Sequence, residues 1–351
     1  MTTPLRVLLA CPPSGNPYVS ELLRSLNERP DVTCVQDHRE FLDEEELDYD
    51  VVHFQWPEAI FGWNARVTDA DILRMEEKLR HCRERGITLV GTVHNEAPHV
   101  LANPLFSRLY ACLYLSLDAL VHLGRASVKA IAGANIASRA RHCVIPHGNY
   151  DVFKRLQTEN GSMGKTREHF TVLCFGAVRK PEEVYTICRV ADCLSSHGGK
   201  LIVAGRVFSG SRKKFRYYRM QLPLRWRRNI QLIPGKIPDD QVATVVSDCD
   251  ALLIPRVDTL NSGNVALGFT FGKVVIGPDI GVIGEELKRL GNPVFTPFKR
   301  STFKAAVDDA VRLTGSSLGE VNRHHADTEL SWENVSRLHE ELYRSLQQSS
   351  W

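Results

Sequence analysis

ALLIPRVDTLNSGNVALGFTFG, residues 251–272, places an apolar strand, a polar loop and an apolar helix in direct succession. The loop ends in Asn261-Ser262-Gly263, small residues at the amino end of the predicted helix. The first N–H groups of a helix have no partner within it, and the helix dipole adds a partial positive charge there. The stretch therefore predicts a strand–loop–helix unit of an α/β protein that can bind a phosphate group. A Ser-Gly turn that only joins a strand to a helix has the same pattern.

A second stretch of the same kind lies upstream. Residues 170–176, FTVLCFG, predict a buried parallel strand from Val172 to Phe175, and Gly176 allows the chain to turn out of the sheet. Arg179 and Lys180 follow where open α/β sheets bind ligands, at the carboxyl ends of strands. Two solvated loop cations are the alternative interpretation. Two anion sites at one sheet edge indicate a diphosphate-bearing ligand, such as a nucleotide sugar.

Length and composition indicate the class of protein. The chain has 351 residues, which is too long for one ordinary core and fits two domains. Its 43% hydrophobic and 24% charged residues are typical of a globular protein. The nine cysteines include no Cys-x-x-Cys pair, which indicates buried thiols in a reducing compartment. We expect no signal peptide and no membrane-spanning helix, since the most apolar helix, residues 101–123, is interrupted by Arg108 and Asp118.

Apolar strands alternate with amphipathic helices along both halves of the chain. We expect strands at 6–11, 51–54, 88–93, 119–123, 144–146, 171–175, 200–204, 230–233, 251–255 and 274–277. This alternation predicts an α/β fold class, with two facing Rossmann-like domains and a cleft between them. The domains are residues 1–157 and 168–330, separated by a polar linker at 158–167. A closing C-terminal helix, residues 331–351, packs back toward the first domain.

Two basic stretches carry no acid. Residues 206–228 hold nine Lys or Arg interleaved with Tyr217, Tyr218 and Trp226, and residues 125–141 form a shorter run. Aromatic side chains beside cations favour docking on an anionic membrane surface over a plain solvated loop. Nucleic acid attracts similar side chains, but we recognise no nucleic-acid-binding motif and expect no such partner.

The first turn excludes a common class of α/β enzyme. After the first strand the chain reads PPSGNPY, residues 12–18, which is not the Gly-x-Gly-x-x-Gly loop of a dinucleotide-binding oxidoreductase. The Asp-x-Asp pairs at 48–50 and 248–250 each precede an apolar strand, so we interpret them as strand-edge caps. No His/Cys cluster has zinc spacing. We therefore expect no metal and no cofactor.

Three segments of the first half carry polar residues at strand ends. They are HFQWPE at 53–58, TVHNEAPH at 92–99 and PHGNY at 146–150. A single histidine in such a place is often only structural. Three such segments at one edge of a sheet indicate the lining of an active site.

With these segments the sequence resembles the GT-B glycosyltransferases of bacterial exopolysaccharide assembly. The resemblance is closest to the xanthan-type β-mannosyltransferases, glycosyltransferase family 94. The matching pieces occur in the family's order and span most of both predicted domains: Asn16-Pro17-Tyr18, His53-x-x-Trp56-Pro57-Glu58, Val93-His94-Asn95-x-Ala97-Pro98-His99, His147-Gly148-x-Tyr150, Phe175-Gly176-x-Val178-Arg179 and Asn261-Ser262-Gly263.

The resemblance implies a GT-B fold and transfer of a hexose, mannose from GDP-mannose, onto a polyprenyl-diphosphate-linked oligosaccharide. The protein would be cytoplasmic, peripheral on the inner face of the cell membrane, and independent of metal. The donor would bind the second domain and the acceptor the first. The residues assigned to the donor are Gly176, Arg179, Lys180, Arg206, Asn261, Ser262 and Gly263. Those assigned to the acceptor or sugar lining are Asn16, Tyr18, His53, Trp56, Asn95, His99, His147 and Tyr150.

Two departures from the family pattern concern the donor site. Glu182 stands where the family has a lysine, and Arg256 stands where it often has a tyrosine. Lys180 and Arg256 are the cations that can compensate for the missing lysine.

Inversion is the expected stereochemistry. Retaining GT-B enzymes often carry two glutamates around the phosphate-loop helix, and residues 258–272 contain none. The general base that deprotonates the acceptor hydroxyl would be Glu58 or His94. Three alternatives remain open: a retaining transferase that uses a UDP-sugar, a sugar-nucleotide epimerase, and a non-catalytic scaffold that binds a nucleotide sugar.

Overall fold

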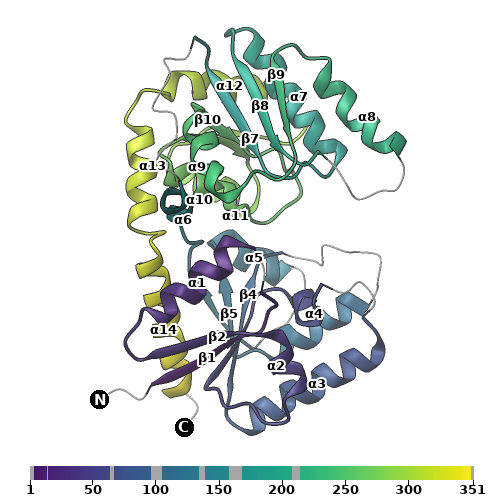
Figure 1. The fold of residues 1–351 in the computed structure, drawn as a ribbon, viewed down its shortest axis with the longest axis vertical. Coiled ribbons are helices and arrows are strands. Elements are labelled where there is room, and N and C mark those ends of the chain that lie inside the picture. Colours follow the sequence, from purple (N-terminus) through teal and green to yellow (C-terminus); the bar gives the residue numbers. More distant parts are fainter. Residues whose placement is uncertain are drawn as a thin grey trace. The chain divides into compact units, whose positions relative to one another are not determined.

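The computed structural model describes residues 4–13, 15–63, 67–95, 105–133, 139–157, 168–207 and 214–348, with the backbone alone at 133 and 214–219. The chain divides into two compact units (Figure 1). Unit 1 comprises Met1–Gly148 and Glu329–Trp351, and unit 2 comprises Asn149–Thr328. The predicted linker at 158–167 and the predicted site residue His99 lie outside the described residues.

Unit 1 is built on a parallel sheet. Its strands are β1 (Leu5–Leu9), β2 (Val32–Gln36), β3 (Val51–Phe54), β4 (Thr88–Val93), β5 (Ala119–His122) and β6 (Arg141–Val144). They form one six-stranded sheet in the order β2-β1-β3-β4-β5-β6. The strands β3, β4 and β5 are buried along their whole length, as parallel strands covered on both faces are. The edge strand β6 is mostly exposed.

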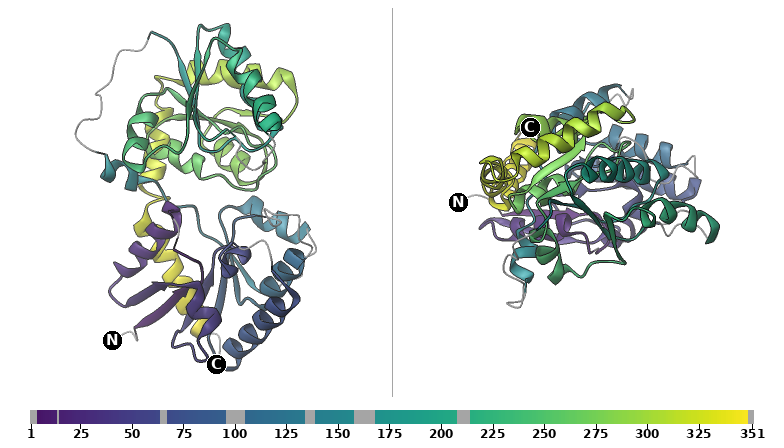
Figure 2. Two further views of the ribbon diagram at one scale, coloured as in Figure 1. Left: turned by 45° about the vertical axis from the view of Figure 1, so that its right-hand side comes forward. Right: turned by 90° about the horizontal axis from the view of Figure 1, so that it is seen from above.

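Helices cover both faces of this sheet (Figures 1 and 2). α1 (Pro17–Asn27) and α14 (Trp332–Gln348) lie side by side on one face, and α3 (Asp69–Glu84) and α4 (Leu105–Ser116) on the other. The first turn of α1 is fixed by Asn16, whose side chain accepts a hydrogen bond from the Tyr18 N–H, and by a proline at the first helical position. The shorter helices are α2 (His38–Asp43), the 3₁₀ helix η1 (Pro57–Phe61) and α5 (Arg125–Gly133).

The last helix, α14, belongs to unit 1 although unit 2 precedes it in the sequence. Its apolar positions are buried in the same core as α1 and β1; they are Trp332, Val335, Leu342 and Tyr343. An ion pair between Arg29 and Glu340 (Nε to Oε2, 2.5 Å) joins α14 to the end of α1. Unit 1 is therefore assembled from two separate parts of the chain.

Unit 2 repeats the architecture. Its strands are β7 (Thr171–Phe175), β8 (Lys200–Gly205), β9 (Ile230–Pro234), β10 (Ala251–Leu253), β11 (Val274–Pro278) and β12 (Val294–Phe295), in the parallel order β12-β11-β10-β7-β8-β9. One face carries α7 (Pro181–Ser195), α8 (Lys214–Arg225) and α12 (Arg300–Leu313). The other carries α9 (Asp239–Ser247), α10 (Gly263–Thr270), α11 (Gly281–Arg289) and α13 (Leu318–Asp327), and α6 (Asp151–Leu156) packs on α9. The predicted α/β class is confirmed.

Candidate functional site

The two predicted anion segments lie on neighbouring strands of the unit 2 sheet. β7 and β10 pair directly and end at the same edge, because they are parallel. The side-chain amide of Asn264 donates to the carbonyl oxygen of Phe175 (2.8 Å), which ties the first turn of α10 to the end of β7. The hydroxyl oxygen of Ser262 caps α10 by accepting the Asn264 N–H (3.4 Å). The structure thus brings together the segments around Gly176 and Gly263.

A buried carboxylate organises the cations at this edge. Glu183, in the first turn of α7, is 3% exposed; its Oε2 accepts the backbone N–H of Arg179 (2.5 Å), and its Oε1 lies 3.6 Å from Nε of Arg256. Partial burial, and next the charge of Arg256, lower the pKa of the Arg179 guanidinium. Two guanidinium groups and one carboxylate leave a net positive charge that attracts an anion. The sequence prediction did not include Glu183.

The neighbouring charged side chains have other surroundings. Lys180 pairs with Asp258 at the surface. Glu182, which replaces the lysine of the family pattern, is exposed at the second position of α7, where the helix dipole favours a carboxylate. Its neighbour Glu183 points the other way, since successive residues are about 100° apart around a helix. The acid beside the arginines is therefore the buried Glu183, which pairs with Arg256 and accepts the backbone N–H of Arg179.

Arg206 leaves β8 beside this cluster. The N–H of Val178 donates to the Arg206 carbonyl (2.9 Å) and that of Gly176 to the Ala204 carbonyl (2.8 Å), so the loops after β7 and β8 run side by side. Gly205 has a φ of +147°, and a Cβ there would clash with the Gly176 carbonyl. A cavity of about 510 Å³, lined by the ends of β8 and β9 and by α8, opens next to Arg206. Its volume is in the range of small-molecule sites.

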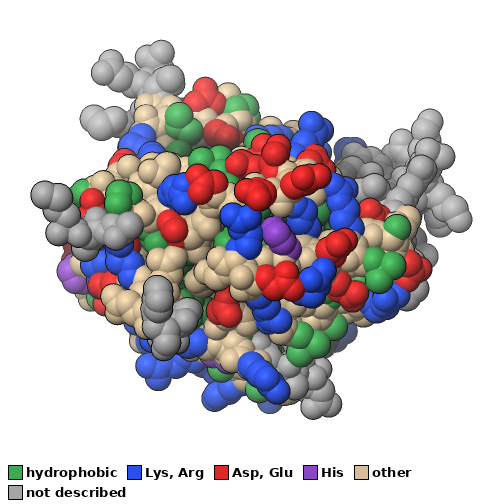
Figure 3. All heavy atoms as spheres, turned by 90° about the horizontal axis from the view of Figure 1, so that it is seen from below, with side chains coloured by type: hydrophobic (Ala, Val, Ile, Leu, Met, Phe, Trp, Pro, Cys, Tyr) green, Lys and Arg blue, Asp and Glu red, His purple; other side chains and the backbone are tan. Residues whose placement is uncertain are grey.

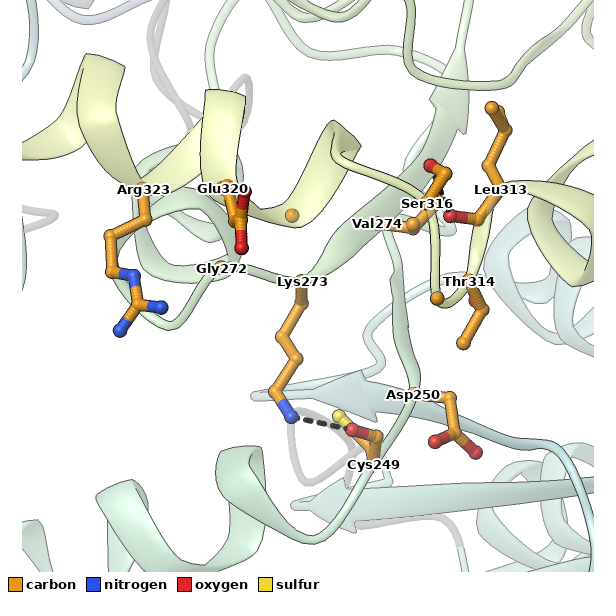
Figure 4. A pocket seen from close by; sticks show the side chains of 12 residues that line it. Cys249, Asp250, Gly272, Lys273, Val274, Leu313, Thr314, Ser316, Glu320 and Arg323 are labelled. Atoms are coloured by element: carbon orange, nitrogen blue, oxygen red, sulfur yellow. Dashed lines mark hydrogen bonds between the residues drawn. The ribbon is translucent and has the colours of Figure 1, made fainter.

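Another cavity, of about 470 Å³, opens at the opposite edge of the same sheet (Figure 4). It lies at the amino ends of β10 and β11, and two of its charged side chains, Lys273 and Asp250, form hydrogen bonds with the backbone. Lys273 donates to the carbonyl oxygens of Ser247 (3.0 Å) and Cys249 (2.7 Å), the second of which is dashed in Figure 4. Asp250 accepts the Thr171 N–H (2.7 Å). We assign no ligand to this cavity.

In unit 1, aromatic side chains predicted to line the acceptor site gather where β3 and β4 end. The His94 ring stacks on Trp56, with centroids 4.1 Å apart and planes at 19°. The Tyr18 ring meets His94 edge-on at 5.3 Å and also contacts the His147 ring at 4.8 Å. Trp56, His94 and His147 are each partly exposed, so the cluster is open to a ligand.

A chain of hydrogen bonds runs from this cluster into the core of unit 1. Nε2 of His94 lies 3.0 Å from Oε1 of Gln55, and Nε2 of Gln55 lies 3.4 Å from Nε2 of His53. Nε2 of His53 is also 2.8 Å from the Thr92 hydroxyl, and its Nδ1 is 2.7 Å from the hydroxyl of Tyr343. The last helix is therefore linked to the cluster by hydrogen bonds that pass through two buried polar side chains, His53 and Gln55.

This network determines which ring nitrogens carry protons. The Gln55 amide donates to Nε2 of His53, so the proton of His53 resides on Nδ1, which donates to Tyr343. The oxygen of the same amide accepts Nε2–H of His94, so the lone pair of His94 resides on Nδ1. Burial, and next repulsion by His339 and His94, lower the pKa of His53 well below its usual value. His53 therefore stays neutral, in one tautomer, and connects Tyr343 to Gln55.

The second predicted base, Glu58, is in a different environment. It is 3% exposed in η1, and its Oε2 accepts the hydroxyl hydrogen of Tyr110 (2.7 Å) on α4. Burial, and next the charge of Glu58, raise the pKa of Tyr110, which keeps the hydroxyl as a donor. His94 is half-buried, so it is the more accessible of the two, and Glu58 as the base stays a prediction.

The remaining predicted residues of this set have separate places. Asn16 caps α1, and Asn95 follows His94 in a half-buried position. Tyr150 belongs to unit 2, where its N–H donates to the hydroxyl of Thr270 (3.0 Å) and its ring stacks on Phe153.

Trp63 has an unusual backbone. It follows Gly62 at the end of η1 with a φ of +64°, and its side chain is 47% exposed. A non-glycine residue in this region costs about 1–3 kcal/mol. Its ring lies 5.5 Å from that of Trp56, at 49°. No sequence pattern predicts the backbone conformation of Trp63, because bulky residues rarely adopt a positive φ.

The end of α8 exposes part of the predicted membrane contact. The basic stretch at 206–228 is described in part, and in that part Leu222, Arg225, Trp226 and Arg228 are exposed, Trp226 at 78%. Residues 208–213 of that stretch and 134–138 of the shorter one lie outside the described residues. On the face in Figure 3, basic and acidic side chains are intermingled. Within the described ranges, no helix combines the length and apolar character needed to cross a membrane.

No protein-family model and no curated protein matches this chain. Among solved structures, sucrose-phosphate synthase from Thermosynechococcus elongatus is 13% identical with a TM-score of 0.66, over 99% of this chain and 100% of that one. Anabaena Alr3699/HepE in complex with UDP and glucose is 14% identical with a TM-score of 0.66, over 97% and 100%. Trehalose-6-phosphate synthase, in a study of glycosyl transfer with retention, is 10% identical with a TM-score of 0.64, over 97% and 99%. The likeness establishes the fold, which is GT-B.

Proposed function

We propose that this protein is a nucleotide-sugar-dependent glycosyltransferase whose donor binds unit 2 and whose acceptor binds unit 1. The observation that carries the proposal is the cluster of Arg179, Glu183 and Arg256 at the carboxyl edge of the unit 2 sheet, beside the amino end of α10. The cavity next to Arg206 would hold the nucleoside, and the cluster would hold the diphosphate.

The chemistry follows from the charges at this edge. The bond between the anomeric carbon and the diphosphate oxygen breaks, and the acceptor oxygen forms the new bond to that carbon. Negative charge develops on the departing diphosphate, and the arginines and the first N–H groups of α10 stabilise it. The proton of the acceptor hydroxyl goes to Nδ1 of His94, the nitrogen on which Gln55 leaves the lone pair. These steps need no metal, so activity in EDTA is expected.

The donor is the first property to test. The motif resemblance favours GDP-mannose, and the UDP complex of the similar Anabaena protein makes UDP-glucose the second choice. We would measure the Tm of the protein in EDTA with GDP, UDP, ADP, dTDP and their common sugars, because a ligand of the native state raises Tm. A GDP-mannose preference supports the mannosyltransferase, a UDP-sugar preference replaces the donor, and no shift with any nucleotide contradicts the proposed function.

We propose a polyprenyl-diphosphate-linked oligosaccharide as the acceptor, in exopolysaccharide assembly at the inner face of the cell membrane. The end of α8 supports contact with an anionic membrane, because Leu222 and Trp226 are exposed one turn apart and Arg225 and Arg228 flank them. We expect binding to vesicles that rises with anionic lipid, falls with salt and weakens in Trp226→Ser. Equal binding to neutral vesicles would rule out the electrostatic part.

Retention is the second stereochemical outcome to examine. The similar trehalose-6-phosphate synthase was studied for transfer with retention. Inversion is proposed for this chain because His94 offers a base and residues 258–272 contain no glutamate. Proton NMR of the first product distinguishes the two anomers directly.

A further inference from the structure

Trp63 combines three properties that folding alone does not explain. Its backbone is in the left-handed region, at a φ of +64°, where a glycine would be unstrained. It is 47% exposed, so about half of this large residue is open to solvent. Its ring contacts that of Trp56, which is itself partly exposed. A strained residue that keeps a large ring at the surface is a feature of binding sites.

The neighbours of Trp63 indicate the chemistry of a ligand. Trp56 contacts Trp63 (centroids 5.5 Å apart) and stacks on His94 (4.1 Å), so the three rings form a connected row in which Trp56 contacts both others. The row ends at a partly exposed imidazole whose Nε2–H is held by Gln55. Apolar ring faces beside polar nitrogen atoms fit a molecule with a flat C–H face and a hydroxyl rim, which is the form of a hexose in its chair conformation.

We propose that Trp63 is a stacking platform for a hexose ring of the acceptor. The inference rests on the proposed function in one respect, namely that the acceptor is a saccharide. The C–H face of the hexose lies on the exposed indole, and its hydroxyl rim points along the row toward His94. Trp63 is then a binding residue, which affects acceptor affinity and leaves the nucleotide site of unit 2 unchanged.

Phe298 supplies a matched control. It is the other described non-glycine residue with a positive φ, at +63°, and it is 56% exposed. It lies in unit 2 after β12, with its ring 6.0 Å from Tyr185. Trp63→Gly and Phe298→Gly each remove an exposed ring and place glycine where the backbone favours it. We expect both variants to keep the Tm of the unaltered protein or to exceed it.

The test is an NMR titration of the full chain carrying ¹⁵N-tryptophan, with cellobiose, maltose and mannobiose as probes. The Trp63 indole signal is assigned from its absence in Trp63→Gly, and the exposed Trp226 indole on unit 2 is an internal control. We expect one disaccharide to shift the Trp63 signal and to leave that of Trp226 in place. We expect Trp63→Gly to weaken binding about 10-fold, as the loss of one aromatic stacking contact implies, and Trp63→Phe to recover part of it. Phe298→Gly should bind like the unaltered protein.

Two results would contradict the proposal that Trp63 is a stacking platform. One is saccharide binding that is unchanged in Trp63→Gly, or that shifts other indole signals and not that of Trp63. The other is the absence of any shift with all three disaccharides. In either case the nucleotide titration of Tm decides the proposed function separately, because its ligands bind unit 2.

Discussion

The hydroxyl of Tyr343 lies 2.7 Å from Nδ1 of His53, and this hydrogen bond joins residues 290 positions apart in the sequence. Both groups are fully buried, and burial raises the pKa of Tyr343 well above its usual value, so the phenol stays protonated. Through His53 and Gln55 the bond extends to the half-buried His94. The C-terminal helix thus helps to set the orientation of a side chain at the carboxyl end of β4.

Replacing Tyr343 by Phe should destabilise unit 1. The substitution leaves Nδ1–H of His53 without its acceptor in the core, which costs about 1–3 kcal/mol of unfolding free energy. Tyr49→Phe is the control, because it also removes one phenolic hydrogen bond (to Glu40, 2.6 Å) in unit 1, but at a partly buried position. Urea unfolding of both variants measures the difference. Equal losses of unfolding free energy in the two variants would mean that the buried hydrogen bond contributes no more than the partly buried one.

Replacing Gln55 by Glu should change the pH dependence of transfer. A carboxylate next to Nε2 favours the charged imidazolium, so the pKa of His94 rises and the acid limb of the rate profile moves to higher pH. Gln55→Leu removes the acceptor of Nε2–H and should lower kcat without that displacement. An unchanged acid limb in Gln55→Glu would exclude His94 as the base.

Replacing Arg256 by Ala should weaken binding of nucleoside diphosphates about 10-fold or more, because one charge-assisted contact is lost. Binding of the uncharged nucleoside should hardly change, since the contact is to the diphosphate. Arg189→Ala is the control: Arg189 also pairs with a carboxylate in unit 2, that of Asp192 on the surface of α7. Calorimetric titrations of the three proteins test the expectation, and a diphosphate affinity equal to that of the control would contradict it.

Stability should fall as the pH drops below about 6.5, the usual pKa of histidine. Burial lowers the pKa of His339 to about 4, and burial with repulsion from His142 lowers that of His122 to about 4. Between these values the unfolded chain binds protons that the folded chain does not, so the neutral histidines stabilise the fold above pH 6.5 and this contribution is lost toward pH 4. Measurements of Tm from pH 7.5 to 4.5 check this, and His339→Gln should flatten the curve. A Tm of the unaltered protein that does not change with pH would contradict the lowered pKa values of these histidines.

The sequence predicts the strands that are continuous apolar runs, and it does not predict β2 and β12, whose sequence patterns are weak. β3, β4 and β7 were expected where they occur, because they are continuous apolar runs. β2 was not expected: it is a sheet edge with alternating exposure, and its five residues include Thr33 and Gln36. β12 has only two residues. Neither length nor periodicity marks such strands.

The candidate site was predictable only where its residues follow strands. His94 comes directly after a buried run and Arg179 four residues after one, and these positions place them at a sheet edge. Glu183 carries no such signal, because acids at positions two and three of a helix commonly interact with the helix dipole. Only the orientation of the helix about its axis shows which of the two acids is buried. The bond between Tyr343 and His53 depends on tertiary packing across the whole chain, which periodicity within a window does not report.

The division of unit 1 into two parts of the chain has a consequence for biosynthesis. A ribosome releases β1 to β6 first, then the whole of unit 2, and only afterwards α14, whose Trp332 and Tyr343 fill the core of unit 1. Unit 2 is contiguous from residue 149 to residue 328, so it can complete its own contacts while the nascent first sheet still exposes the face that α14 will cover. During synthesis, therefore, the first unit to emerge is the last to be finished.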